Sequence, residues 1–180
     1  MSGSAWLVVI DMQTVFADPG SAWRAPRYAE AAERVRALLP AFAGRTVWTR
    51  FVAPSEPRGS WVPYYEEWGF AREPAASPIW AISGFDPGRD PVVDEPTFGK
   101  WGRRLAAVTG DAPLVLTGVS TDCCVLSTAL AAADDGRFVR VAADACAGAS
   151  DEDHRRALDA MALYRPLITI TDVDALLAAA

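Results

Sequence analysis

The chain has 180 residues, of which 51% are hydrophobic and 22% charged, and it carries a formal net charge of −6. This length and composition are typical of one globular domain, which we expect to span residues 1–180. The acidic balance without a basic stripe, and the lack of an apolar run near the roughly 20 residues that cross a bilayer, exclude nucleic acid and membranes as expected partners.

Short apolar runs of the β type alternate along the chain with longer runs of helical spacing. The predicted strands cover residues 5–10, 46–52, 92–93, 114–119, 138–142 and 167–170. The predicted helices cover residues 28–42, 64–68, 100–108, 123–134, 151–164 and 174–178. This alternation predicts a three-layer α/β/α sandwich of the Rossmann type, with a central, mostly parallel sheet of about six strands.

Residues 53–90 interrupt this pattern with many prolines and aromatic side chains and no clean periodicity. A loop of this length in a compact domain is usually functional. Its aromatic residues could belong to the core, to a subunit interface or to a pocket for a flat or apolar ligand, and the sequence leaves these alternatives open.

The cellular compartment is indicated by the N-terminal segment and the cysteines. The apolar run at residues 5–10 lacks the basic flank of a signal peptide and ends in an acid. The three cysteines, Cys123, Cys124 and Cys146, have no disulfide-framework spacing and suit a reducing compartment. We therefore expect a cytoplasmic protein.

Three reactive residues lie after predicted strands, where parallel α/β sheets place their ligands. Asp11, at a desolvated strand end, suits acid–base chemistry, although a lone aspartate there is more often a turn or capping residue. Cys124 falls in the first turn of a predicted helix, whose dipole would lower the pKa of the thiol; a buried, inert cysteine is the ordinary alternative. Lys100 is the single lysine among 17 Lys and Arg residues, and near Cys124 it would favour the thiolate; otherwise it is a surface lysine.

Metal and cofactor sites are poorly supported by the sequence. The only histidine, His154, lies in the strongly polar segment DEDHRR and is expected to be solvated rather than a catalytic base. One histidine and three unsuitably placed cysteines do not make a tetrahedral zinc set, and no glycine-rich phosphate loop is present. We expect neither a metal nor a cofactor.

With these positions marked, two segments resemble the isochorismatase-like cysteine hydrolase superfamily, which includes nicotinamidases and N-carbamoyl amide hydrolases. They are VVIDMQTVF and GVSTDCCVLSTALAAADDGRFVRVAADACA, and the resemblance covers nearly the whole chain. It implies an isochorismatase-like α/β fold with Asp11 as the catalytic acid and Cys124 as the nucleophile. It also implies a cis peptide bond between Val119 and Ser120, with the amides of Ser120 and Cys124 forming the oxyanion hole.

The chain departs from the family pattern at two places. The residue aligned with the family's lysine is Glu95, and because a glutamate beside Cys124 would oppose thiolate formation, we assign the catalytic cation to Lys100. The stretch TRFVAPSEPRGSW has no histidine where family nicotinamidases bind a divalent ion, which argues against a metal and against nicotinamidase activity. Isochorismatases proper usually lack the cysteine, so Cys124 argues against vinyl-ether hydrolysis.

The resulting hypothesis is a hydrolase of the amidase type that cleaves a C–N bond in a small amide, imide or carbamoyl compound through a thioester on Cys124. Two other interpretations stay open: a non-catalytic small-molecule-binding protein of the same fold, and a thiol redox protein using Cys123 and Cys124. The family resemblance and the tryptophan-rich segments predict a homodimer or homotetramer. The candidate pocket residues are Phe16, Trp61, Tyr65, Glu95 and Val119.

Overall fold

The computed structural model describes residues 5–179, which form six strands and the helices between them. The strands are β1 (Trp6–Ile10), β2 (Thr46–Phe51), β3 (Val92–Glu95), β4 (Leu114–Val119), β5 (Val139–Ala147) and β6 (Ile168–Thr171). The α-helices are α1 (Thr14–Ala17), α2 (Tyr28–Leu38), α3 (Trp61–Glu67), α4 (Arg103–Thr109), α5 (Leu126–Asp134), α6 (Asp151–Ala162) and α7 (Val173–Ala178). Short 3₁₀ helices cover Leu39–Phe42, Gly69–Ala71 and Pro78–Trp80, and a π-helical turn covers Thr121–Val125.

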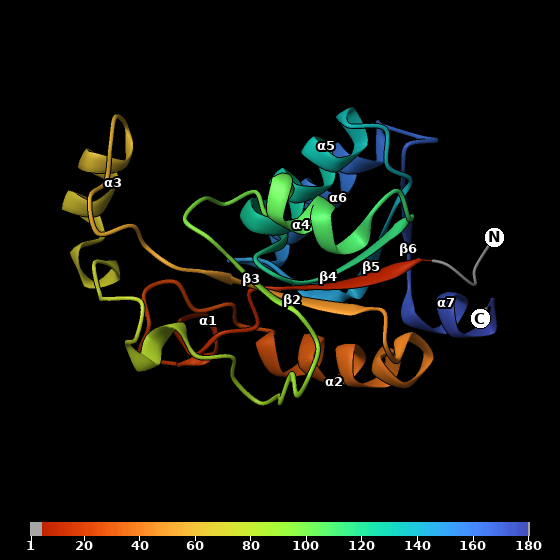
Figure 1. Cartoon of the computed structure of the whole chain (residues 1–180), viewed down its shortest axis with the longest axis horizontal. Helices are drawn as coiled ribbons and strands as arrows, with labels where there is room; N and C mark the ends of the chain where they lie inside the picture. The colour runs from red at the N-terminus through yellow and green to blue at the C-terminus, as the bar shows by residue number, and fades with distance from the viewer. Residues whose placement is uncertain (1–4, 180) are drawn as a thin grey trace.

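The strands form one parallel sheet in the order β3-β2-β1-β4-β5-β6. Helices α4, α5 and α6 cover one face, and α1, α2 and α7 cover the other (Figure 1). The predicted three-layer α/β/α architecture is therefore confirmed. The strand order reverses between β1 and β4, and ligands of such sheets bind beyond the carboxyl ends at this switch point.

The central strands are apolar on both sides because each contributes to two cores. In β1, Leu7 and Val9 join the apolar cluster that includes residues of α2 and α7. Their neighbours Val8 and Ile10 point the other way, into the cluster that includes residues of α4, α5 and α6. Each such buried side chain contributes roughly 1.5–3 kcal/mol, so the continuous apolar run fixes the strand in the middle layer.

Several elements differ in extent from the prediction. Helix α4 begins at Arg103, so Lys100 lies in the extended segment before the helix. Strand β5 continues to Ala147, well past the predicted end at residue 142. Helix α1 follows directly after β1 and is too short for a periodic pattern to reveal it. Residues 53–80 form an excursion beyond the carboxyl end of the sheet, with α3 at its far end, and residues 81–90 run back past α2 to the start of β3 (Figure 1).

Gly118 lets strands β1 and β4 approach closely at the edge that carries the reactive residues. Its φ is +106°, and a Cβ atom there would lie 2.0 Å from the carbonyl oxygen of Ile10. Any other residue would meet both the backbone strain of a positive φ and this collision. Glycine therefore brings the residues after Ile10 and those after Val119 side by side.

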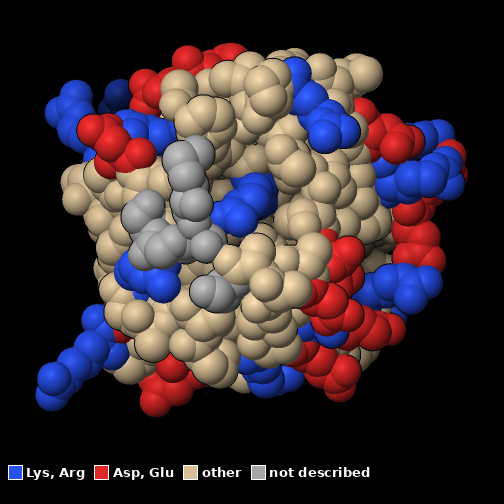
Figure 2. Space-filling model, turned by 90° about the vertical axis from the view of Figure 1, so that its right-hand side faces the viewer, with Lys and Arg blue, Asp and Glu red and all other residues tan. Residues whose placement is uncertain are grey.

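The surface of the described residues gives two further facts. No helix within residues 5–179 combines the length and apolar character that spanning a membrane requires. On the face at the amino ends of the strands, basic side chains lie scattered among acidic ones and do not merge into one positive surface (Figure 2).

Candidate active site

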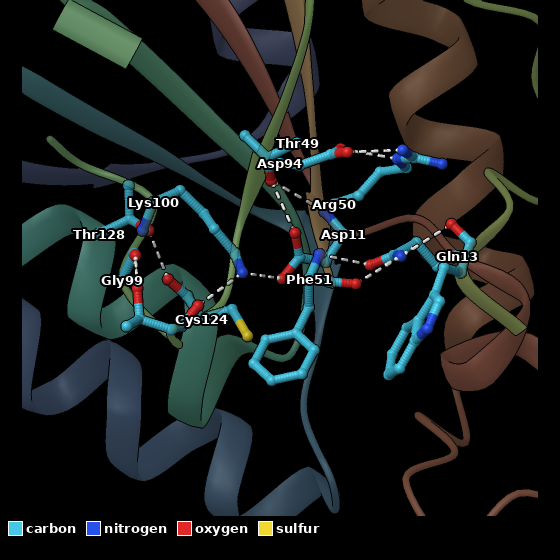
Figure 3. A network of polar contacts seen from close by, with 12 residues as sticks. Asp11, Gln13, Thr49, Arg50, Phe51, Asp94, Gly99, Lys100, Cys124 and Thr128 are labelled. Carbon is cyan, nitrogen blue, oxygen red and sulfur yellow. Dashed lines mark hydrogen bonds and ion pairs between the residues drawn. The ribbon is translucent and has the colours of Figure 1, made fainter. Parts of the chain in front are cut away.

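The carboxyl ends of the strands bring together Asp11, Lys100 and Cys124, which are far apart in the sequence. Asp11 directly follows β1, Lys100 lies between β3 and α4, and Cys124 lies in the π-helical turn after β4. In Figure 3 the ammonium of Lys100 points toward the carboxylate of Asp11, and the sulfur of Cys124 lies beside them and points toward the ring of Phe51. The arrangement joins a carboxylate, an ammonium group and a thiol in one buried cluster.

Asp11 is held from its backbone and from its side chain. Its φ is +50°, an uncommon conformation for a residue with a side chain, and its amide donates to the carbonyl of Thr49 at 3.2 Å. The hydroxyl of Thr49 donates to Oδ1 of Asp11 at 2.7 Å, and Nζ of Lys100 lies 2.9 Å from Oδ2. Both oxygens of this fully buried carboxylate therefore have a partner, as a buried charge requires.

Lys100 is fully buried and links Asp11 to the π-helical turn that contains Cys124. Its ammonium donates to the carbonyl of Thr97 at 2.7 Å and lies 4.9 Å from the ring centre of Phe51. Its backbone amide donates to the hydroxyl of Thr128 at 2.9 Å, and that hydroxyl donates to the carbonyl of Cys124 at 2.6 Å. One short chain of hydrogen bonds thus fixes the segment of the lysine against the segment of the cysteine.

Glu95 lies outside this cluster, although it aligns with the family's lysine. It ends β3, and its carboxylate is 3.9 Å from the guanidinium of Arg104, an exposed side chain. Lys100, five residues later in the loop, reaches the site instead, and its ammonium forms an ion pair with Asp11.

Cys124 is buried in the π-helical turn, and its surroundings contradict the predicted low pKa. Burial is the largest cause that raises the pKa of this thiol well above its usual value. The negative charge of Asp11 and a hydrogen bond to it raise the pKa further. Lys100 acts in the predicted direction and lowers the pKa, but its effect is outweighed. The thiol therefore keeps its proton at rest, with the Asp11 carboxylate beside it as an acceptor.

This raised pKa predicts the alkylation behaviour of Cys124. Labelling by iodoacetamide is expected to be slow at neutral pH and to accelerate only as the pH rises well into the alkaline range, because the thiolate is the reacting species. Lys100→Met is expected to slow labelling further, since the lysine charge lowers the pKa. Peptide mass spectrometry across a pH series measures both rates. Fast labelling that is already constant below neutral pH would contradict the structure.

Ser120 lies between β4 and the π-helical turn Thr121–Val125. The Val119–Ser120 peptide bond is cis, as the family resemblance implied. Ser120 and Cys124 both line the cavity at this edge of the sheet.

The cavity has a volume of about 360 Å³, and six of the thirteen residues that line it are aromatic. The aromatic side chains that line it are Phe16, Trp23, Phe51, Tyr64, Trp68 and Phe98. The rest of its lining consists of Ala22, Arg24, Ser120, Asp122, Cys123, Cys124 and Ala149. A volume at the lower end of the range for ligand pockets, with flat walls and few polar groups, suits one small flat molecule.

The candidate pocket residues have different places in the structure. Phe16 lines the cavity, and Trp61 supports its wall, with its ring centre 5.2 Å from that of Phe98. Tyr65 is buried and does not line the cavity; Tyr64 on α3 and Trp68, which caps the end of this helix, line it instead. Val119 is fully buried in the core, and Glu95 is likewise absent from the lining.

His154 is not the freely solvated residue that its polar segment predicted. It is half-buried at the start of α6, and its Nδ1 lies 2.8 Å from the hydroxyl of Thr121. Burial is the main cause that lowers the pKa of His154. Within residues 5–179, no group of three or more His, Cys, Asp or Glu side chains is arranged to hold a metal ion. The residues of this site therefore do not fit a metal.

Sequence reasoning missed several residues that shape the site. Thr49 is a polar residue inside a strand buried on both faces, and that contrast was an available indication of a buried partner. Trp23 packs its ring at 5.6 Å from Phe51 and at 6.0 Å from Tyr64, but it lies in an irregular loop that no periodicity marks. Gln13, by contrast, belongs to the segment VVIDMQTVF that carries the family resemblance, and it fixes the neighbouring loop by donating to the carbonyls of Phe51 and Trp80, each at 2.9 Å.

Comparison with known proteins assigns the family. The isochorismatase domain matches residues 5–173. A cysteine hydrolase from Pseudomonas syringae pv. phaseolicola 1448A has a similar structure, with a TM-score of 0.84, 18% identity, and coverage of 99% of this chain and 92% of the other. An N-carbamoylsarcosine amidase from Thermoplasma acidophilum gives a TM-score of 0.74 at 20% identity, over 95% of this chain and 97% of the other.

A pyrazinamidase of Pyrococcus horikoshii, solved in complex with zinc, gives a TM-score of 0.75 at 26% identity, over 94% of this chain and 99% of the other. No curated protein matches the chain by sequence. The domain match nevertheless spans almost the whole chain, and the structural matches share its full length. The protein belongs to the isochorismatase family of hydrolases.

Proposed function

We propose that the protein is a cysteine hydrolase of the amidase type, with Cys124 as nucleophile, Asp11 as acid and base, and Lys100 as the cation that orients Asp11. The observation that carries the proposal is the buried cluster itself. The Lys100–Asp11 pair at 2.9 Å lies beside a fully enclosed thiol that borders an aromatic cavity. A carboxylate next to a protonated thiol at a ligand pocket is the arrangement that nucleophilic catalysis requires.

The reaction begins with attack of the Cys124 sulfur on the substrate carbonyl. The thiol proton passes to Asp11 as the S–C bond forms, and the amides of Ser120 and Cys124 hold the oxyanion. Collapse of this intermediate breaks the C–N bond, and Asp11 returns the proton to the leaving amine. A thioester remains on Cys124.

Water then completes the cycle. Asp11 accepts a proton from water as its oxygen attacks the thioester, and the C–S bond breaks to give the carboxylic acid, or the carbamic acid when the substrate is a carbamoyl compound. The proton finally returns to the Cys124 sulfur. Throughout, the ammonium of Lys100 pairs with Oδ2 of Asp11, and the hydroxyl of Thr49 donates to Oδ1. These two contacts fix the orientation of the carboxylate relative to the thiol.

The substrate class follows from the cavity walls. Aromatic rings from α1, β2, α3 and two loops surround the thiol, so a flat, apolar acyl or amine group would pack against them. The charged side chains of the lining are Arg24, which is exposed, and Asp122, which accepts a hydrogen bond from the amide of Ala149 at 2.9 Å. We propose a small, planar amide, imide or carbamoyl compound as substrate.

The test is a panel of small amides, imides and N-carbamoyl compounds with aromatic or aliphatic groups. Ammonia or amine release is measured, and the thioester is trapped with hydroxylamine. We expect aromatic compounds to be turned over faster than aliphatic ones of equal length, with product release dependent on Cys124. Absence of turnover across the panel, with the compounds nevertheless bound, would favour a non-catalytic binding protein instead.

A further inference from the structure

The π-helical turn Thr121–Val125, called the nucleophile turn below because it contains Cys124, contacts helix α6 and the loop before it through residues outside the buried cluster. The hydroxyl of Thr121, the first residue of the π-helical turn, lies 2.8 Å from Nδ1 of His154. The next residue, Asp122, accepts a hydrogen bond from the amide of Ala149. Thr121 is fully buried, so its hydroxyl needs a protein partner, and His154 is the partner that the structure supplies.

The fit between the two segments leaves little room for another arrangement. A Cβ atom on Gly148 would lie 2.8 Å from Oδ1 of Asp122 and 2.9 Å from the amide nitrogen of His154. The loop between β5 and α6 therefore packs its bare backbone against the turn. Behind His154 lies a second cavity of about 360 Å³, lined also by Arg27 and Asp151, so the imidazole is not backed by tightly packed side chains. The position of the imidazole ring, and of the turn that it contacts, therefore depends on the hydrogen bond to Thr121 rather than on packing behind the ring.

The π-helical geometry of the turn makes contacts from outside it important. A π-helical turn is uncommon and has weaker internal hydrogen bonding than an α-helix, and such turns are often found at functional sites. In the proposed mechanism the sulfur of Cys124 must reach Asp11, and both Cys124 and Ser120, the residue just before the turn, line the cavity. A small rotation of the turn would move both at once.

We propose that the Thr121–His154 hydrogen bond is a positioning contact of the active site, which holds the nucleophile turn so that the Cys124 sulfur meets Asp11. This inference rests on the proposed function, in which Cys124 is the nucleophile. His154 does not touch the reacting atoms; it acts through Thr121. The neutral imidazole, which burial favours by lowering the pKa of His154, provides one donor and one acceptor, so either direction of this hydrogen bond is available.

Two pairs of variants test this contact. Thr121→Val and His154→Leu each remove it, while Thr121→Ser keeps the hydroxyl and His154→Asn keeps a hydrogen-bonding atom near the position of Nδ1. We expect the first pair to lower kcat on the order of tenfold with little change in KM, because misplacement of a reacting group is costly. The second pair is expected to stay within a few-fold of the wild type. The double variant Thr121→Val/His154→Leu should be no slower than either single variant, since both remove the same interaction.

Alkylation of Cys124 provides a readout that does not depend on turnover. It is measured by peptide mass spectrometry in all variants, with Cys123 in the same peptide as the internal reference, and melting temperatures identify variants that merely lose stability. We expect Thr121→Val, His154→Leu and the double variant to change the Cys124-to-Cys123 labelling ratio by the same amount. Thr121→Ser and His154→Asn are expected to keep the ratio of the wild type. Unchanged ratios, or effects of the two substitutions that simply add, would overturn the proposal even if the protein proves to be an amidase. If the panel of amides gives no turnover, the labelling ratio still decides whether this contact positions the sulfur.

Discussion

Replacing Cys124 with alanine is expected to abolish amide turnover while leaving the fold intact. Loss of the nucleophile in enzymes of this kind lowers kcat by roughly 10⁴- to 10⁶-fold, because no other group can form the covalent intermediate. The side chain is small, and its removal leaves a cavity that costs no more than about 2 kcal/mol of stability. Turnover, trapping of the thioester and the free energy of unfolding are measured on the same preparation.

The neighbouring cysteines provide matched controls for this substitution. Cys123 lines the same cavity and donates to the carboxylate of Asp122 at 3.6 Å, whereas Cys146 is buried in the core beneath α6. Burial is the first cause that raises the pKa of Cys123 to about 11 and that of Cys146 to about 12. Cys123→Ser and Cys146→Ser are therefore expected to keep most of the activity.

The same three substitutions separate the competing functions. Loss of activity in Cys123→Ser as well as in Cys124→Ala would indicate thiol redox chemistry that uses both sulfurs. Turnover retained in Cys124→Ala would remove the nucleophile from the proposed mechanism altogether. The three cysteines are free thiols in the structure, so no disulfide complicates these substitutions.

The sequence predicted the layers of the fold because its strands are long, apolar and regularly spaced. The run LVLTGV, for example, is buried at every position of β4, as a central parallel strand must be. The end of β5 was placed too early because residues after 142 mix small and polar side chains, and only pairing with β4 on one side keeps them extended. The local pattern does not contain that information, because the pairing partners Gly118 and Val119 lie 28 positions upstream of Cys146 and Ala147.

The sequence predicted a site residue well when its residue type is rare in the chain, and less well when its properties depend on how deeply it is buried. Lys100 was found because it is the only lysine, and the structure places it 2.9 Å from Asp11. The raised pKa of Cys124 could not be read from its place at the start of a helix, since it follows from burial and from the adjacent carboxylate of Asp11, which together outweigh the charge of Lys100. The role of Tyr64 rather than Tyr65 in the pocket depends on the orientation of α3, which a seven-residue element does not reveal in sequence.

Lys100→Met is expected to destabilise the protein by about 3–5 kcal/mol, because it leaves the buried carboxylate of Asp11 without its counter-charge. Both side chains of this pair are 0% exposed, so solvent cannot replace the lost partner. Denaturation in urea measures the free energy of unfolding. As a matched control, Arg50→Met removes a guanidinium 2.6 Å from Asp94 on the neighbouring strand, where the side chains are 28% and 40% exposed, and the expected cost is at most about 1 kcal/mol.

The double variant Asp11→Asn/Lys100→Met shows whether the pair serves stability or chemistry. Removing both charges eliminates the unpaired carboxylate, so we expect the double variant to regain much of the stability lost in Lys100→Met, since apolar or neutral replacements of buried ion pairs are often tolerated. Turnover is expected to be lost in every one of these variants, because the Cys124 proton then has no charged acceptor. A Lys100→Met variant as stable as Arg50→Met would mean that water or another cation pairs with Asp11. Recovery of stability without recovery of turnover would instead show that this costly pair is kept in the core for the chemistry of the site.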